Sequence, residues 1–424
     1  MFSRPADGND VSFFEQVQKK IYPQRPLHEV AERFSRLLRG YRSCFGETDG
    51  LHCFSVPGRT ELGGNHTDHQ YGRVLAAGVD LDTIAAASRN GTDKIRIFSE
   101  GYGKIELPAC KTQPQRGEEN TAAALVRGVV AFLWEQGYPV QGFNAYISSE
   151  VLPGSGLSSS ASFAVLIACI CNGLCARGML SDLTLAFAGQ YAENQYFLKP
   201  CGLMDQLACT LEGAVSLDFA DPANPVVEKV PFSPAGAGYA LCIIDCGTGH
   251  GGLTGEYAAI TQEMHSVASF FGKQVLREVK EEEFYACIKT LRQSAGDRAV
   301  LRALHFYEEN RRVRQEADEL RAGNFERFLE LVRRSGHSSY QYLQNVIPFG
   351  AVFHQEMGIA LALCEKQLGE KGACRVHGGG FAGTIQAFVP LKQVSAFCQS
   401  VEAVLGCGCC HVLCVRLAGA VQLW

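Results

Sequence analysis

Apolar positions along the chain follow two periods, and each period predicts a different kind of element. Apolar residues three or four positions apart predict helices, whereas alternation of apolar and polar residues predicts strands. Val30, Phe34, Leu37 and Leu38 share one face of a helix expected at 27–41, with Gly40 as its stop. Further helices are expected at 121–136, 161–176, 255–272, 281–293 and 297–334, and strands at 52–56, 79–87, 94–98, 142–148, 239–245, 384–389 and 412–417, with a helix between the last two strands.

Four prolines between residues 218 and 234 interrupt this pattern near the middle of the chain. Because proline clusters mark linkers and edge connections, we expect a boundary there, between a lobe at 1–220 and a lobe at 221–424. The first half mixes strands and helices without the regular alternation of a doubly wound sheet. The segment 297–334 is heavily charged and broken at Gly323, so we expect it on an outer face.

Composition and charge exclude two classes of protein. The 424 residues include 39 basic and 44 acidic side chains, a formal charge of −5. Hydrophobic residues make up 46% and charged residues 20%, which is typical of a globular chain rather than a disordered one. A weakly acidic chain without a run of five basic residues has no field to hold a phosphate backbone, so no nucleic-acid partner is expected.

The 18 cysteines bear on the cellular compartment. Their density is below that of disulfide scaffolds. The first 11 residues are polar where an export signal would be apolar, and the longest apolar run, 164–171, is too short to span a bilayer. We therefore expect a soluble cytoplasmic protein with free thiols and no membrane partner. Four cysteines near the end of the chain, Cys407, Cys409, Cys410 and Cys414, suggest a metal site. Their spacing differs from that of zinc sites, so we interpret them instead as buried side chains that act as small hydrophobic residues.

A glycine- and serine-rich segment, Gly154, Ser155, Gly156, Leu157, Ser158 and Ser159, precedes the apolar helix expected from residue 161. Helix amino termini offer unpaired N–H groups and a partial positive charge, and glycines let the backbone approach an anion. The segment therefore predicts a phosphate cradle, with a serine-rich helix cap as the alternative. It lacks the lysine of a Walker A loop.

Two more segments are rich in glycine. Residues 247–252 match G-x-G-x-x-G after a strand, which suggests a dinucleotide-dependent oxidoreductase as a rival function. The chain that follows is charged and helical instead of forming a second strand that ends in an acid, so a glycine-rich turn is the better interpretation. Residues 377–383 carry four glycines and predict either a tight turn or a phosphate-facing loop.

Polar side chains concentrate at 58–69, which we place between two strands. Three interpretations stay open: a solvated turn, a metal pair formed by His66 and His69, and a polyol site, since sugar hydroxyls need donors and acceptors at short range. Further along, Asp205 lies among apolar neighbours, so burial against a cation is expected.

Four motifs, taken in order, resemble a known family. They are Gly-Arg followed by His-Thr-Asp, Pro-Gly-Ser-Gly-Leu-Ser-Ser-Ser-Ala, Ala-Glu-Asn followed by Cys-Gly-Leu-Met-Asp-Gln, and Gly-Gly-Gly-Phe-Ala-Gly. Together they look like the galactokinases, which belong to the GHMP small-molecule kinases. The likeness runs from about residue 25 to the end and implies an α+β fold of two lobes, with mixed sheets, helices and an active site in the cleft between the lobes.

The resemblance also implies site residues and ligands. The substrates of the protein would be ATP and a sugar, for which galactose is the first choice, and the product would be galactose 1-phosphate. Mg²⁺ would be the cofactor, and the chain would act as a monomer. Arg59 and Asp205 would flank the hydroxyl that is phosphorylated, and Arg59 would keep Asp205 ionised, either as a base or as an orienting group. The implied sugar-binding residues are Asn65, His66, Asp68, Gly202 and Tyr257; residues 154–159 would hold the ATP phosphates, Ser160 and Glu193 would hold Mg²⁺, and Gly378 to Gly380 would support the site.

The first motif departs from the family pattern Arg-x-Asn-x-Ile-Gly-Glu-His-x-Asp-Tyr. Glu61 replaces the Asn, Asn65 the Glu and His69 the Tyr. The family's Glu contacts a sugar hydroxyl remote from the reacting carbon, and an amide there loses the charge-assisted part of that bond. Another aldose, an amino sugar, or a non-catalytic sugar sensor on the same fold are therefore the alternatives.

Overall fold

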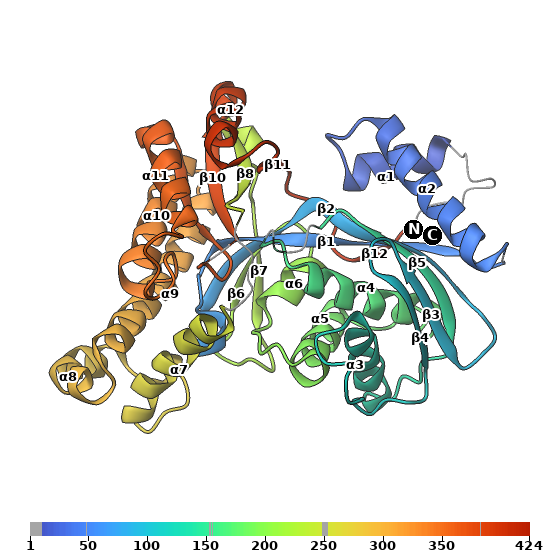
Figure 1. Cartoon of the computed structure of the whole chain (residues 1–424), viewed down its shortest axis with the longest axis horizontal. Helices are drawn as coiled ribbons and strands as arrows, with labels where there is room; N and C mark the ends of the chain where they lie inside the picture. Colours follow the sequence, from blue (N-terminus) through green and yellow to red (C-terminus); the bar gives the residue numbers. More distant parts are fainter. Residues whose placement is uncertain (1–10, 48, 152–153, 155, 248–252, 382) are drawn as a thin grey trace.

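The computed structural model describes residues 11–47, 49–151, 154, 156–247, 253–381 and 383–424, whose strands form two sheets (Figure 1). The helices are α1 (Val11–Ile21), α2 (Leu27–Phe45), α3 (Ala122–Glu135), α4 (Ser159–Leu174), α5 (Asp182–Tyr191), α6 (Met204–Thr210), α7 (Thr254–Phe270), α8 (Glu281–Ser294), α9 (Asp297–Arg321), α10 (Phe325–Ser338), α11 (Glu356–Leu368) and α12 (Val394–Leu405). The strands are β1 (His52–Gly63), β2 (Arg73–Arg89), β3 (Lys94–Ser99), β4 (Gly103–Pro108), β5 (Phe143–Ser149), β6 (Ala214–Asp218), β7 (Val226–Val230), β8 (Tyr239–Asp245), β9 (Ala373–His377), β10 (Thr384–Pro390), β11 (Cys410–Leu413) and β12 (Val421–Gln422).

The larger sheet has the order β12-β1-β2-β5-β3-β4. In addition, β6 pairs with the first residues of β2, and β7 pairs with β6. All its pairings are antiparallel except that of β3 with β5. Helices cover both faces: α1 and α2 lie on one, and α3, α4 and α5 on the other (Figure 1). Successive strand residues alternate between the two cores, since Ala85 packs with α3 and α4 while Ala86 packs with α1 and α2.

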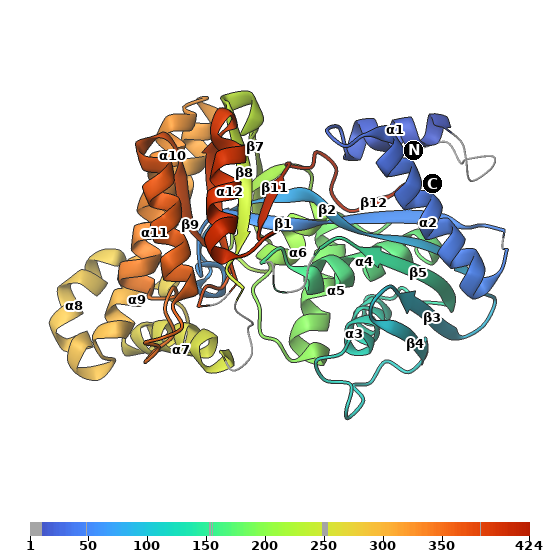
Figure 2. The same cartoon turned by 45° about the horizontal axis from the view of Figure 1, so that its top comes forward.

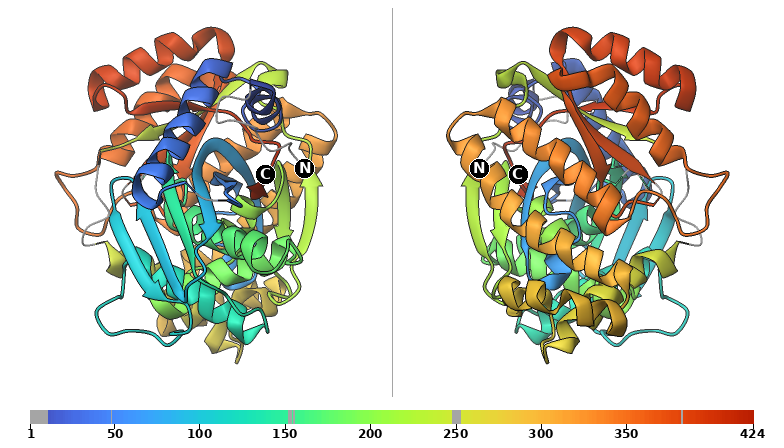
Figure 3. Two further views of the ribbon diagram at one scale, coloured as in Figure 1. Left: turned by 90° about the vertical axis from the view of Figure 1, so that its right-hand side faces the viewer. Right: turned by 90° about the vertical axis from the view of Figure 1, so that its left-hand side faces the viewer.

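The smaller sheet has the order β11-β8-β10-β9 and is antiparallel throughout. Helices α11 and α12 cover one face (Figure 2). Its other face packs against α9, α10 and residues of β1 and β2, so one apolar core joins the two sheets. End-on views show strands of the larger sheet at one end of the molecule and the orange helices of the second half at the other (Figure 3).

The boundary expected at residue 220 falls between β6 and β7, which pair with each other in the larger sheet. Strand β12, close to the end of the chain, also returns to that sheet by pairing with β1. The two-lobe division at 220 therefore stays a prediction. Within the described ranges, no helix combines the length and the apolar character needed to cross a membrane.

Most of the expected elements are confirmed to within a few residues, but three expectations need correction. Gly40 does not stop its helix: α2 continues to Phe45, and Gly40 lies where a Cβ would meet the Tyr146 ring at 2.3 Å. The polar segment that begins at residue 58 is not wholly between strands, because β1 continues to Gly63 with two irregularities in its pairing. The break at Gly323 is confirmed by the end of α9 at Arg321.

The third correction concerns the charged helix α9, only one side of which lies on an outer face: Arg311 and Asp318 are exposed, whereas charged residues on the opposite side are buried. Arg302, His305, Glu309 and Glu316 on α9 are each 0% exposed. Glu309, for example, accepts hydrogen bonds from the Gly64 backbone N–H at 3.0 Å and from the Ser335 hydroxyl at 2.6 Å. Charge predicts exposure only when no buried partner is available, and here the partners come from distant parts of the chain.

The glycine-rich segment at 247–252 follows β8, and residues 248–252 lie outside the described residues. β8 pairs antiparallel with β10 and β11. A dinucleotide-binding unit needs β8 in a parallel pair joined by a crossover helix, so the sheet agrees with setting that interpretation aside.

Candidate active site

The centre of the candidate site is a buried ion pair between Arg59 on β1 and Asp205 on α6. Arg59 Nε donates to Asp205 Oδ1 at 2.7 Å, and the Ser158 hydroxyl donates to Asp205 Oδ2 at 2.6 Å. The two ionic side chains are 6% and 16% exposed. Both oxygens of the carboxylate are thus held by groups from other elements, with β1, the start of α4 and α6 meeting at one point.

Charge keeps this pair ionised despite its burial. Burial alone would raise the pKa of Asp205, but the nearby charges of Arg59 and Lys199 bring it below its ordinary value. Burial likewise opposes the charged form of Arg59, and Asp205 more than compensates, so the pKa of Arg59 rises. Asp205 is therefore a carboxylate at neutral pH and can accept a proton or a hydrogen bond.

The glycine- and serine-rich segment packs directly behind this pair. Gly156 has φ +69°, and a Cβ there would lie 2.4 Å from Thr384 Oγ1, so only glycine fits. The Gly156 carbonyl accepts from Arg59 Nη1, and the Leu157 carbonyl accepts from the Arg59 backbone N–H at 3.1 Å. The Leu157 side chain is buried, so this residue can offer a ligand only its backbone.

The rest of the segment leads into α4, which begins at Ser159. Ser158 directly before it has φ 59°, and Gly154 is exposed. Ser155 lies outside the described residues. The amino terminus of a 16-residue helix, with its first backbone N–H groups, thus lies next to the Arg59–Asp205 pair, as a phosphate-binding site requires.

Ser160 and Glu193, the predicted metal-binding residues, lie on either side of one lysine. Lys199 Nζ is 3.5 Å from Ser160 Oγ and 3.8 Å from Glu193 Oε2. Glu193 is 0% exposed, and neither of its oxygens accepts a hydrogen bond within the described part of the chain. A buried carboxylate without hydrogen bonds and a serine hydroxyl, both within 4 Å of the same lysine nitrogen, offer hard oxygen donors of the kind that Mg²⁺ takes.

Asp68 and Gly202 meet on the other side of the pair. A Cβ at Gly202 would lie 1.9 Å from Asp68 Oδ2, so the carboxylate can occupy its place only beside glycine. Burial, and then the charge of Asp205, raise the pKa of Asp68 to about 6. Asp68 is therefore close enough to Asp205 for the two carboxylates to interact.

His66 and Tyr257 both contact the glycine loop at 378–380. His66 Nε2 is 3.0 Å from the Gly379 carbonyl, and the Tyr257 hydroxyl donates to the Gly380 carbonyl at 2.8 Å. Burial lowers the pKa of His66 to about 4, so its imidazole is neutral and donates to that carbonyl. The glycine loop thus connects residues of the first and second halves of the chain.

Asn65 does not join these residues at an accessible surface. It is 0% exposed. Its Nδ2 donates to Glu61 Oε1 at 3.0 Å and to the Gly378 carbonyl at 2.7 Å, and its Oδ1 accepts from Asn345 at 2.8 Å. Protein groups thus use both ends of its amide, and the contact with sugar expected of Asn65 stays a prediction.

Sequence reasoning missed two groups around the site. Lys199 is one of them. The only feature of the sequence that could have indicated it is its position between two predicted site residues, Glu193 and Gly202. The other is Arg375 on β9, which is 0% exposed, pairs with Glu61 and donates to the Leu62 carbonyl at 3.1 Å. An arginine inside an apolar strand was its signal, although nothing in the sequence identifies its partner.

Two family models match the chain. Residues 39–89 match the galactokinase galactose-binding signature, and residues 124–213 match the GHMP kinase N-terminal domain. The first range contains Arg59, His66 and Asp68, and the second contains Ser158 and Asp205. Both matched ranges therefore supply residues to the candidate site.

Whole-chain comparisons agree with these matches. The chain is 31% identical over 348 residues to a galactokinase of Actinobacillus pleuropneumoniae, with 80% of this chain and 85% of that protein covered. It is 30% identical over 342 residues to a galactokinase of Glaesserella parasuis, with 80% and 86% covered.

Solved structures show the same relation. A crystal structure of Lactococcus lactis galactokinase complexed with galactose matches with a TM-score of 0.80 at 27% identity, covering 92% of this chain and 99% of that one. A Methanococcus jannaschii mevalonate kinase structure, at 14% identity and a TM-score of 0.62 over 87% of this chain and 99% of its own, shares the fold. The predicted α+β fold is confirmed, and the chain belongs to the galactokinase family of GHMP kinases.

Proposed function

We propose that this protein transfers the terminal phosphoryl group of ATP to the anomeric hydroxyl of galactose, giving galactose 1-phosphate and ADP. The observation that carries the proposal is the buried Arg59–Asp205 pair, held by Ser158 at the amino terminus of α4. Galactokinases related to this chain over four fifths of its length support the choice of galactose.

At the sugar end, we assign the reacting hydroxyl to Asp205 and neighbouring hydroxyls to Asp68 and His66. Asp68 can accept hydrogen bonds beside Gly202, and Tyr257 packs edge-on against Phe381 with ring centroids 5.5 Å apart. Asn65 would support the sugar site without a direct contact to the sugar, because its hydrogen bonds to Gly378 and Asn345 hold the glycine loop in place. These roles are proposals that rest on the positions of the side chains.

At the phosphate end, we assign the ATP phosphates to the backbone of residues 154–159 and the start of α4. Ser160 and Glu193 would hold Mg²⁺, which neutralises phosphate charge when it is bound. Lys199 lies within reach of both residues and carries a positive charge that the Glu193 carboxylate stabilises, raising the pKa of Lys199. We therefore add Lys199 to the phosphate-binding residues.

Asp205 has two chemical roles open to it, and both need its carboxylate. It can accept the proton of the anomeric hydroxyl, or it can orient that hydroxyl toward the phosphorus. Arg59 keeps Asp205 ionised, and under this assignment its guanidinium would lie beside the phosphoryl group that is transferred. Phosphoryl transfer requires positioning and charge neutralisation more than covalent catalysis; this pair would supply the positioning, and Mg²⁺ with Lys199 the neutralisation.

The test is ADP release by the purified protein with ATP, Mg²⁺ and a panel of sugars, for the wild type and for Asp205→Asn. We expect galactose to be used and the variant to lose ~10²-fold or more in turnover, the usual scale for loss of a general base. Asp221→Asn is the matched control, since Asp221 is an exposed turn residue. Near-normal turnover of Asp205→Asn would contradict the assignment.

The panel also separates the remaining alternatives. ADP release with another aldose or an amino sugar but not with galactose would change the substrate. Sugar binding without ADP release from any sugar would identify a sensor. We further propose that the protein acts as a monomer of two lobes divided near residue 220, with the site in the cleft between them, in the cytoplasm. The free cysteines throughout the described residues agree with a reducing compartment.

A further inference from the structure

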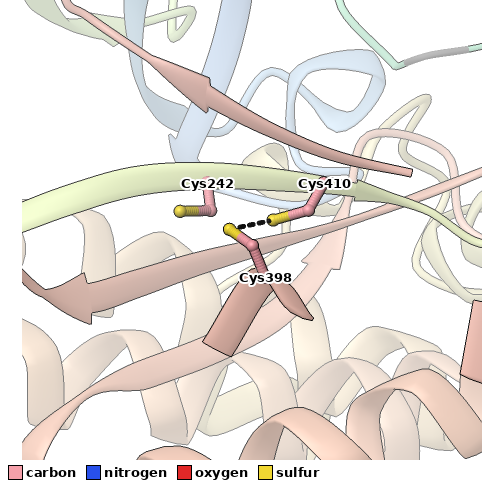
Figure 4. Close-up of side chains that lie close together, drawn as sticks. All are labelled: Cys242, Cys398 and Cys410. Atoms are coloured by element: carbon pink, nitrogen blue, oxygen red, sulfur yellow. Dashed lines mark hydrogen bonds between the residues drawn. The ribbon is translucent and has the colours of Figure 1, made fainter. Parts of the chain in front are cut away.

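Three cysteine sulfurs converge at one edge of the smaller sheet, remote in sequence from the residues assigned to catalysis. Cys242 lies on β8, Cys410 on β11 and Cys398 on α12 (Figure 4). Their sulfur atoms all lie within 4.8 Å of one another, and Cys398 Sγ and Cys410 Sγ are 3.0 Å apart. In the part of the chain that the structure describes, this is the only such group of three potential metal ligands.

The fold itself brings these side chains together. β11 pairs antiparallel with β8, with Val412 opposite Cys242 and Cys410 opposite Ile244, so Cys242 and Cys410 are diagonal neighbours on one face. Helix α12 covers that face, and Cys398 points from it toward the two strands (Figure 4). Two strands and a helix therefore fix the three sulfurs.

The expectation that Cys407, Cys409, Cys410 and Cys414 are buried small hydrophobes is met only in part, because Cys409 and Cys410 pack against the core of the smaller sheet but none of the four is fully buried. Cys407 is exposed, and the other three are half-buried. Cys398 is half-buried as well, whereas Cys242 is fully buried. The group of three therefore lies at the border of the core, with Cys242 on its inner side and the partly exposed Cys398 and Cys410 on the side nearer solvent.

The chemistry of the three ligands selects the ion. All three are sulfurs, and thiolate ligands favour Zn²⁺ and Cu⁺ over ions such as Mg²⁺ and Ca²⁺, which need oxygen. Sulfurs bound to one Zn²⁺ at ~2.3 Å stand ~3.8 Å apart in a tetrahedron. Small side-chain rotations that separate Cys398 from Cys410 and draw Cys242 in would produce that spacing.

We propose that Cys242, Cys398 and Cys410 bind one thiophilic d¹⁰ metal ion, Zn²⁺ or Cu⁺. On binding, the coordinating thiols release their protons to solvent. Cu⁺ would be satisfied by the three sulfurs, whereas Zn²⁺ would take a fourth ligand, such as water, from the open side. The ion would connect β8, β11 and α12, and so stabilise the smaller sheet at its edge without touching the catalytic residues.

The first experiment uses the reduced full-length protein without oxygen, titrated separately with Zn²⁺ and with Cu⁺ against a competing chelator. We expect one tightly retained equivalent of at least one of the two ions, and metal analysis of the protein as isolated identifies which ion it holds. Cysteine alkylation followed by mass spectrometry then maps the site on the wild-type protein. Labelling of Cys398 and Cys410 should fall at least tenfold on metal binding, while labelling of the exposed Cys44, Cys110 and Cys407 stays unchanged.

A matched pair of variants completes the test. Cys398→Ala removes a proposed ligand, and we expect at least a ~10-fold loss of metal affinity. Cys364→Ala is the control, because Cys364 is a buried cysteine of the same core whose sulfur lies outside the group of three. No retained metal, equal retention by both variants, or unprotected Cys398 and Cys410 would overturn the proposal. A Cys398–Cys410 disulfide in the isolated protein, with no metal bound after reduction, would also overturn it and identify an oxidisable pair.

Discussion

Gly202 offers a test of the sugar site that leaves every polar group in place. A Cβ built at this position would lie 1.9 Å from Asp68 Oδ2 and 2.4 Å from Asp68 Cγ. Real Cβ atoms essentially never approach another atom closer than 3.0 Å. The Gly202→Ala substitution therefore requires the Asp68 carboxylate to move by about 1 Å, because it is the free end of a side chain and yields before the backbone does.

The expected loss follows from this displacement. A 1 Å misplacement of a group that positions substrate costs ~10²-fold in rate, or about 2.7 kcal/mol of transition-state stabilisation. We expect kcat/KM for galactose to fall by about this factor, with most of the change in the KM for galactose and little in the KM for ATP. The free energy of unfolding should change little, since only the end of one side chain moves.

Steady-state kinetics with galactose and ATP varied separately measure the effect. Gly255→Ala is the matched control, because a Cβ at Gly255 has no atom within 4 Å and the position lies in α7. Unchanged galactose kinetics in Gly202→Ala, with Asp68 still displaced in a crystal structure of the variant, would refute the role assigned to Asp68.

Two further predictions concern buried charge. Arg375→Met should lower the free energy of unfolding by ~3–5 kcal/mol in urea titrations, because the variant leaves the buried Glu61 carboxylate without its partner. Arg327→Met is the control: it removes one side of an exposed ion pair and should change the free energy of unfolding by less than ~1 kcal/mol. Equal effects of the two substitutions on the free energy of unfolding would contradict this account. The KM for galactose should rise as the pH falls below about 6, because Asp68, with a pKa raised to about 6, becomes protonated there and loses its acceptor charge. A pH profile of KM that is flat down to about pH 5 would count against this role.

The sequence predicted local features well and side-chain partners poorly. The strand 239–245 and the break after α9 were correctly expected, since apolar alternation and glycine act within a few residues. The buried side of α9 was not expected, because its buried charges are satisfied by Gly64 and Ser335, which no periodicity connects to Glu309. Arg375 was not predicted for the same reason, since no local pattern connects it to its partner Glu61.

The site shows the same limit. Arg59 and Asp205, 146 residues apart, were expected together only through a family resemblance, and the structure confirms that they touch. Burial of Asp205 against a cation did follow from its apolar neighbours. The protein partners of Asn65, Gly378 and Asn345, were not expected, because they lie about 300 residues away in the sequence.

Two departures from the family motif are best understood as one change. Glu61 and Asn65, which exchange the carboxylate and the amide of the family pattern, are hydrogen-bonded to each other at 3.0 Å. Glu61 also pairs with Arg375, so the carboxylate at position 61 has a buried cation to balance it.

The exchange keeps the motif inside a connected network, but it leaves no carboxylate at position 65 and commits the amide there to protein groups. The end of the sugar remote from the reacting carbon then lacks a charged partner from this position. Because a charge-assisted hydrogen bond is roughly twice as strong as a neutral one, selectivity among sugars that differ at that end should be weaker here than in relatives that retain the Glu. The hydrogen bonds of Asp205 come from Arg59 and Ser158 and do not involve these two residues, so we expect the exchange to change which sugar is bound and to leave the phosphoryl transfer itself unaffected.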